Sequence, residues 1–115
     1  MISLKSLQAP LQFRELVIYS PLSKLPKSIG HLKHLELVVL HKINLKILPD
    51  EFCHLVSLKR FELTNCRNLN SLPDSFGYLI NLDHMDLPHS SHLQVLPKSF
   101  GNLVNLKYIG LSHSL

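Results

Sequence analysis

Histidine is the residue type in this chain whose abundance first suggests metal chemistry. The 115 residues include eight histidines and two cysteines, and two histidine pairs have an i, i+3 spacing, namely His31 with His34 and His89 with His92. Structural zinc normally needs four converging Cys and His ligands, and no such set converges in the sequence. We therefore expect the histidines to be solvated surface residues, with no bound metal or other cofactor.

His84 and Asp86 are the pair that most nearly resembles a catalytic base and the carboxylate that orients it. They are two residues apart, so on an extended strand both side chains point to the same face. The sequence supplies no Gly-x-Ser-x-Gly elbow, phosphate-binding glycine loop or cysteine with a partner base. Cross-strand charge pairing with Arg60 and Glu62 is the simpler explanation. We predict that the chain is not an enzyme.

These side chains are positioned by a phrase that is repeated along the chain. Leu-Pro tetrapeptides begin at Leu25, Leu48, Leu72 and Leu96, so that successive copies are 23, 24 and 24 residues apart. The copies carry apolar residues at the same offsets, which in the third copy are Leu72, Phe76, Leu79, Leu82, Met85, Leu87 and Leu93. Self-similarity at this period predicts a solenoid, in which each unit buries its apolar edge against its neighbours.

Each unit is predicted to contain a turn, a strand and a return. Apolar residues spaced three positions apart are typical of a short 3₁₀ or α turn, and the two-residue spacing from Met85 to Leu87 is typical of a strand. The proline in each Leu-Pro phrase sets the backbone that enters the turn, and Ser28, Asp50 or Asp74 beside it can accept an amide hydrogen bond.

The domain prediction follows from where the pattern holds. Residues 1–12 are an irregular N-terminal segment or a partial cap, and residues 13–115 are an array of about four to five units, with a fifth strand near residues 15–19. The predicted fold class is α/β, a curved right-handed solenoid with a parallel β-sheet on its concave face and short 3₁₀ or helical turns on its convex face.

Along each strand, the residues that alternate with the buried positions point outward on the inner curve and differ between repeats. Apolar and aromatic residues flank a charged middle, the mixture expected of a protein-recognition surface. About fifteen side chains are fewer than the roughly 20–30 per partner of a standard interface, so we expect weak binding by this segment alone. Tolerated surface residues, or packing against another domain, remain alternatives. The candidate protein-binding residues are Tyr19, Leu37, Val39, His41, Arg60, Glu62, Thr64, His84, Asp86 and Tyr108.

Charge, hydropathy and cysteine usage indicate the kind of partner and compartment. The formal charge of +4 comes from lysines spread through the turns, which argues against nucleic acid as a partner. No apolar run approaches the length of about 20 residues that spans a bilayer. Cys53 and Cys66 occupy different repeat positions and form no plausible disulfide. We therefore expect reduced, buried thiols and a cytoplasmic location without membrane contact.

The phrase L-x-x-L-x-x-[VFMI]-x-L, followed by L-x-x-L-P-x-[SE]-[IF]-G-x-L, resembles the leucine-rich repeat over roughly residues 13–115. The subtype with a cysteine-type turn, as in residues 65–69, is similar to the repeats of plant intracellular nucleotide-binding leucine-rich-repeat proteins, the disease resistance receptors. Ile43, Cys66 and Ser90 hold the position that asparagine usually holds in Ras-group and bacterial repeats.

This resemblance implies a protein-recognition module of an immune receptor, which senses a pathogen-derived or host protein on its concave face and restrains a nucleotide-binding switch. No nucleotide-binding motif lies in these residues. A structural or scaffolding protein of the Ras-group or bacterial type is the alternative. Because the chain ends about halfway through a unit, we expect a fragment truncated at its C-terminus, or a short protein that self-associates through its ends.

Overall fold

The computed structural model describes residues 14–19, 22–87 and 95–110. Within these residues, five parallel strands follow one another in one sheet, and each pairs with the next in the chain. The strands are β1 (Glu15–Ile18), β2 (Leu37–His41), β3 (Arg60–Thr64), β4 (His84–Asp86) and β5 (Tyr108–Gly110). The predicted strand near residues 15–19 is therefore present as β1, whereas the predicted N-terminal segment 1–12 lies outside the described residues.

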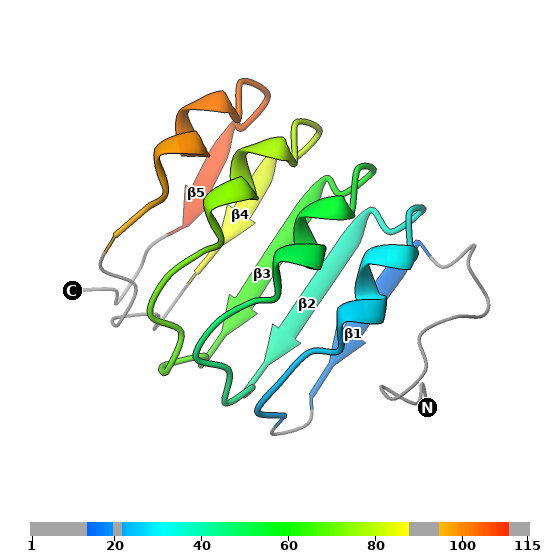
Figure 1. Cartoon of the computed structure of the whole chain (residues 1–115), viewed down its shortest axis with the longest axis vertical. Helices are drawn as coiled ribbons and strands as arrows, with labels where there is room; N and C mark the ends of the chain where they lie inside the picture. Colours follow the sequence, from blue (N-terminus) through cyan, green and yellow to red (C-terminus); the bar gives the residue numbers. More distant parts are fainter. Residues whose placement is uncertain (1–13, 20–21, 88–94, 111–115) are drawn as a thin grey trace.

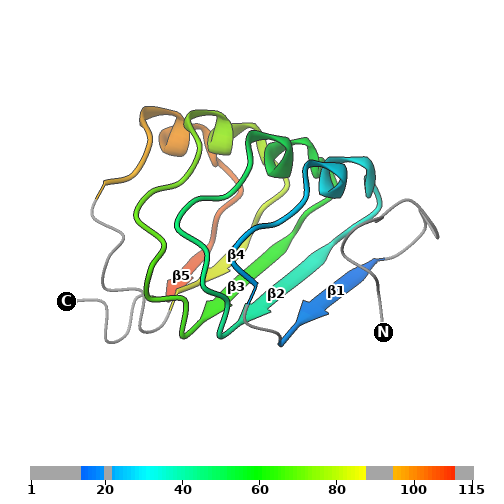
Figure 2. The same ribbon diagram turned by 60° about the horizontal axis from the view of Figure 1, so that its bottom comes forward.

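A short 3₁₀ helix lies between each strand and the next. These helices are η1 (Lys27–His31), η2 (Asp50–His54), η3 (Asp74–Tyr78) and η4 (Lys98–Asn102). The strands lie side by side in one layer, and the helices stack as a second layer over one face of the sheet (Figure 1). A turned view separates the two layers (Figure 2). We call the sheet face that the helices leave uncovered the concave face.

Proline begins each 3₁₀ helix, as the Leu-Pro phrase predicts. Pro26 has φ −68° and ψ 149°, and its carbonyl accepts a 3.1 Å hydrogen bond from the amide of Ile29. The expected side-chain caps are absent from all of the described helices, so the prediction for Ser28, Asp50 and Asp74 was wrong. The fixed φ of proline is sufficient to set the extended entry into each turn.

The core lies between the two layers and has the register that the leucine pattern predicts. Phe61 and Met85, the central residues of β3 and β4, are completely buried. Their neighbours Arg60, Glu62, His84 and Asp86 are exposed or half-buried on the opposite face of the sheet. Because strand side chains alternate between faces, one leucine register determines both the core and the concave face.

Aromatic rings form a spine through this core. The sequence predicts a column of Phe52, Phe76 and Phe100 with Ile29 behind the turns, and the structure adds a ring from the sheet. Phe61 lies between Phe52 and Phe76, with ring centroids 4.8 Å and 6.2 Å from theirs, and Phe76 stacks on Phe100 at 6.3 Å. The spine therefore joins the sheet layer to the helix layer as well as repeat to repeat.

The last described repeat is less covered than the others. Leu96 is 49% exposed and Ile109 is 42% exposed, whereas Leu72 and Met85, at the same positions one repeat earlier, are 5% and 0% exposed. A β-carbon placed on Gly101 would meet no atom within 4 Å. This end of the described array therefore presents apolar side chains that the preceding repeats bury.

Candidate functional site

The concave face is built from three columns of side chains, one from each outward position of the strands. Cross-strand register places Arg60 beside Leu37 and His84, and Glu62 beside Val39 and Asp86. The columns therefore run across the sheet as the sequence predicts. Of the candidate residues, Tyr19, Arg60 and Tyr108 are exposed, and the half-buried ones are Leu37, Val39, His41, Glu62, Thr64, His84 and Asp86.

The N-terminal part of the concave face is apolar. Val17 and Val39 are partners in register between β1 and β2, and Leu37 lies two residues before Val39 on the same face. The ring of Tyr19 contacts that of His41 edge to face, with centroids 5.2 Å apart. Val17 remains 43% exposed and Tyr19 69% exposed. Exposed apolar side chains that adjoin one another on a sheet are typical of a contact surface.

The middle of the concave face carries charges that have no ion-pair partner among the described residues. Arg60 and Glu62 lie beside His84 and Asp86 in register, yet the described ion pairs involve other residues. The expectation that cross-strand pairing neutralises these side chains was wrong. Register places Glu62 opposite Asp86, so like charges face each other across the two strands.

The C-terminal part of the concave face is aromatic and lies beside these carboxylates. The rings of His84 and Tyr108 stack with centroids 4.4 Å apart and an interplanar angle of 13°. Gly110 lies beneath Asp86 and Tyr108, since a β-carbon there would be 2.2 Å from Asp86 Oδ1 and 2.8 Å from the Tyr108 hydroxyl. Glycine at this position therefore allows a carboxylate and a phenol to converge.

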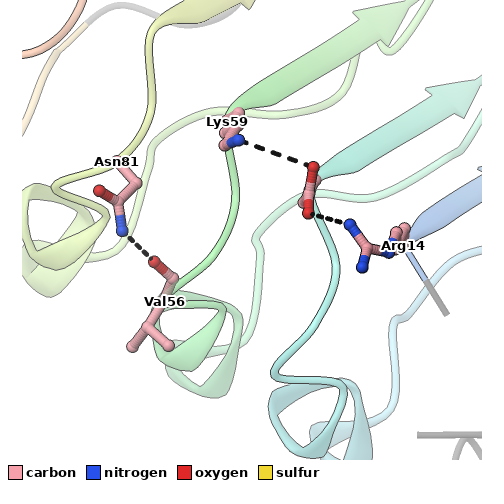
Figure 3. A network of polar contacts seen from close by, with 5 residues as sticks. Arg14, Val56, Lys59 and Asn81 are labelled. Atoms are coloured by element: carbon pink, nitrogen blue, oxygen red, sulfur yellow. Dashed lines mark hydrogen bonds and ion pairs between the residues drawn. The ribbon is translucent and has the colours of Figure 1, made fainter. Parts of the chain in front are cut away.

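A ladder of alternating charge borders the concave face. Sequence reasoning missed it because only residues within the predicted strands were considered, and the ladder lies one residue before each strand. The residue before each strand alternates in sign, and backbone amides link this column from repeat to repeat. Glu36 accepts from Arg14 at 3.1 Å and lies 3.8 Å from Lys59 (Figure 3). The column consists of Arg14, Glu36, Lys59, Asp83 and Lys107.

Asparagine side chains link the repeats on the outer turns. Asn81 Nδ2 donates a 2.7 Å hydrogen bond to the carbonyl of Val56 in the preceding repeat (Figure 3). Asn105 makes the same bond to Ile80 at 2.6 Å. This column of exposed asparagines fixes one turn against the next. The 24-residue spacing of the two asparagines was the available signal.

An open cleft lies away from the concave face, between the returns of the first two Leu-Pro repeats. Its volume is about 670 Å³, and it is lined by Lys24, Lys46, Asn44, Asn70 and the exposed Ile47, among others. Sequence reasoning did not find this cleft, because its lining residues come from neighbouring repeats.

The part of the chain that the structure describes contains neither a cluster of metal ligands nor an exposed cysteine thiol. No group of three or more His, Cys, Asp or Glu side chains there could hold a metal ion, and His89 and His92 lie outside that part. Cys53 and Cys66 are buried and free. Burial raises the pKa of both thiols, which keeps them protonated and weakly nucleophilic. None of the described helices is long and apolar enough to cross a membrane.

Comparison with known proteins identifies the fold. The chain matches no protein-family model and no curated protein. Among solved structures, a leucine-rich repeat protein of Leptospira interrogans is 29% identical, with a TM-score of 0.54 over 90% of this chain. The leucine-rich repeat domain of the type III effector XopL is 18% identical, with a TM-score of 0.46 over 88% of this chain.

The chain spans about a third of the Leptospira protein, 32%, and 56% of the XopL domain chain. This chain has a 23–24-residue repeat, a parallel sheet and short 3₁₀ turns, and it is similar over 90% of its length to a structure described as a leucine-rich repeat protein. The predicted fold class is therefore confirmed, and the chain is an α/β solenoid of the leucine-rich repeat type.

Proposed function

We propose that this chain is a non-enzymatic protein-recognition module that binds a protein partner through its concave face. The observation that carries the proposal is that exposed Val17 and Tyr19 beside β2 share one sheet face with Arg60, Glu62 and Asp86 of β3 and β4, which lack ion-pair partners among the described residues. Such a surface contains the apolar anchors and polar groups of an interface. The likeness to leucine-rich repeat proteins also favours interaction over catalysis.

A matched pair of variants tests this proposal by proximity labelling and pull-down. Leu37→Ala/Arg60→Ala/Tyr108→Ala removes three concave side chains without touching the buried column. The control variant removes exposed apolar, basic and tyrosine side chains from the outer turns, as Ile80→Ala/Lys33→Ala/Tyr78→Ala. Partners should be lost with the concave variant and kept with the control. Partners that persist with the concave variant would contradict the proposal.

At the finer level, we propose that the module belongs to a plant intracellular immune receptor, acts in the cytoplasm and senses a pathogen-derived or guarded host protein. The support is that the repeat phrase and its cysteine-type turn resemble the repeats of these receptors. Cys66, the cysteine of that turn, is 1% exposed and lies below the turn. Its Sγ donates to the carbonyl of Leu40 at 3.3 Å. The reading frame around residues 1–115 tests this, because a receptor requires a nucleotide-binding domain upstream.

A scaffolding protein of the bacterial type is the second candidate, because the 29% identical structure comes from a bacterium. In either case the apolar end formed by Leu96 and Ile109 offers a surface for self-association or for a further repeat. Sedimentation at several protein concentrations tests self-association. A monomer whose state does not change with concentration would contradict it.

A further inference from the structure

The carboxylates of Glu62 and Asp86 form an acidic pair at the centre of the concave face. The two residues are partners in the parallel register of β3 and β4, so about 4.8 Å separates their backbones. Like charges directly opposite on neighbouring strands destabilise a sheet. Both side chains are half-buried, and neither is in an ion pair among the described residues. The two negative charges therefore lie on neighbouring strands with no compensating cation among the described residues, and a cation from a partner would relieve their repulsion.

The charge of the concave face is opposite to that of the whole chain. Its described ionised side chains are those of Glu15, Arg60, Glu62 and Asp86, which give a net charge of −2 when histidine is neutral, whereas the chain carries +4. The lysines lie elsewhere, on the turns and in the charge ladder. A partner with basic character is complementary to this face and is repelled by the remaining surface.

The surroundings of the acidic pair favour an organic cation. The stacked rings of His84 and Tyr108 stand beside Asp86, and Tyr108 is 48% exposed. Asp86 Oδ1 and the edge of the Tyr108 ring both lie directly above Gly110, so the carboxylate and the phenol are close neighbours. A guanidinium group can bond carboxylates through its planar fork and stack on an aromatic ring at the same time, which an ammonium group does less well.

The apolar part of the concave face adds a second requirement. Val39 on β2 lies two strands from Asp86 on β4, a distance of about 10 Å between strand axes. An extended segment rises about 3.3 Å per residue, so about three residues cover that distance. The face therefore suits an extended segment that carries a large apolar residue about three positions from a basic one.

We propose that the partner docks an arginine between Glu62 and Asp86, against the ring of Tyr108, with an apolar side chain over Val17, Leu37 and Val39. This inference rests on the proposed function and adds the chemistry of the partner. The occupant is a protein segment that is basic at one point and apolar about 10 Å away.

Selection of displayed random peptides against the intact chain tests the proposal without knowledge of the natural partner. Enriched peptides should contain arginine with Leu, Ile, Phe or Val about three positions away. Glu62→Gln/Asp86→Asn should weaken binding of the enriched peptides by about tenfold or more, because charge-assisted bonds are lost while shape is kept. Asp50→Asn/Asp74→Asn, which removes two carboxylates from the outer turns, should leave binding unchanged.

The outcomes separate the two proposals. Peptides that lose affinity with Leu37→Ala/Tyr108→Ala but not with Glu62→Gln/Asp86→Asn would overturn the basic-partner inference and keep concave binding. Peptides insensitive to both variants, or no enrichment over an unrelated protein, would overturn both. Binding that is abolished by a chelator would mean that the carboxylates hold a metal ion, which also overturns the arginine. Thermal melting of Glu62→Gln/Asp86→Asn should equal or exceed that of the parent chain, because a like-charge contact is removed.

Discussion

The amide of Gly77 donates a 2.9 Å hydrogen bond to the hydroxyl of Ser99, one repeat further along the chain. The same hydroxyl donates to the carbonyl of Asp74 at 2.6 Å. Ser99 therefore links the turns of the last two Leu-Pro phrases. A β-carbon on Gly77 would lie 2.0 Å from the carbonyl oxygen of Ser99. Glycine is thus required at position 77 by close approach of backbones and not by a positive φ.

Gly77→Ala should destabilise the chain by about 1–3 kcal/mol, because the added methyl group forces apart two turns that meet through backbone atoms. Gly101→Ala is the matched control, since it has the same Ser-Phe-Gly context and no atom within 4 Å of the new β-carbon. It should be neutral, or more stable by about 0.4–1 kcal/mol through the unfolded state. Urea unfolding compares the two variants. Equal losses would show that the spacing between turns does not depend on glycine.

Phe76→Ala should cost about 3–5 kcal/mol, a large part of the total stability of a domain of this size. Its ring is completely buried and lies in the aromatic spine between those of Phe61 and Phe100. Arg60→Ala on the concave face should change stability by less than about 0.5 kcal/mol, because the side chain is exposed. Thermal melting measures both. Comparable losses would mean that the assignment of faces is wrong.

Lys42→Asn should stabilise the chain by about 0.5–1 kcal/mol. Lys42 has φ 57°, in the left-handed region that disfavours lysine, and its amide is held there by a 2.8 Å bond to the carbonyl of Thr64. Asn65, at the same position one repeat later, has φ 56°. Lys46→Asn makes the same change at an exposed position without positive φ and should not stabilise. An equal gain from both variants would point to charge and not to backbone conformation.

The register of the core could be predicted because the repeat makes one alignment apply to every unit. If Met85 faces the core, the repeat period predicts that Phe61 also faces the core. Strand alternation predicts that His84 faces the opposite side, and the structure agrees for all three residues. The Leu-Pro phrase predicted the turns for a similar reason, since proline fixes a local dihedral angle and needs no tertiary partner.

Contacts that depend on side-chain conformation could not be predicted in this way. Register placed Arg60 beside His84 and Glu62 beside Asp86 correctly, but adjacency does not determine whether two charged groups meet. Insertion of Phe61 between Phe52 and Phe76 depends on ring orientation in the same way. The ladder through Arg14, Glu36 and Lys59 was accessible to sequence reasoning, and would have been found by continuing the columns one residue before the strands.

The buried cysteines should make stability fall as the pH rises above about 8.5. Burial raises the pKa of the Cys53 thiol. A hydrogen bond with Ser75 lowers this pKa and the negative charge of Asp50 raises it, and the net shift is upward. Burial also raises the pKa of Cys66, against lowering backbone hydrogen bonds. Between the unfolded and folded pKa values, the native state binds more protons than the unfolded state, so the free energy of unfolding decreases with pH. Below that range the contribution is fully present.

Cys53→Ala/Cys66→Ala removes this dependence and serves as the comparison. The advantage of the parent chain over the variant in urea unfolding should be larger at about pH 7 than at about pH 9.5, where tyrosine and lysine are still mostly protonated. Iodoacetamide should label neither thiol in the native chain at a rate typical of an exposed cysteine, and should label both in urea, because only the thiolate of an accessible cysteine reacts. Rapid labelling of the native chain would show that the thiols are accessible to solvent. The same difference in free energy of unfolding between parent and variant at both pH values would also contradict raised pKa values for the thiols.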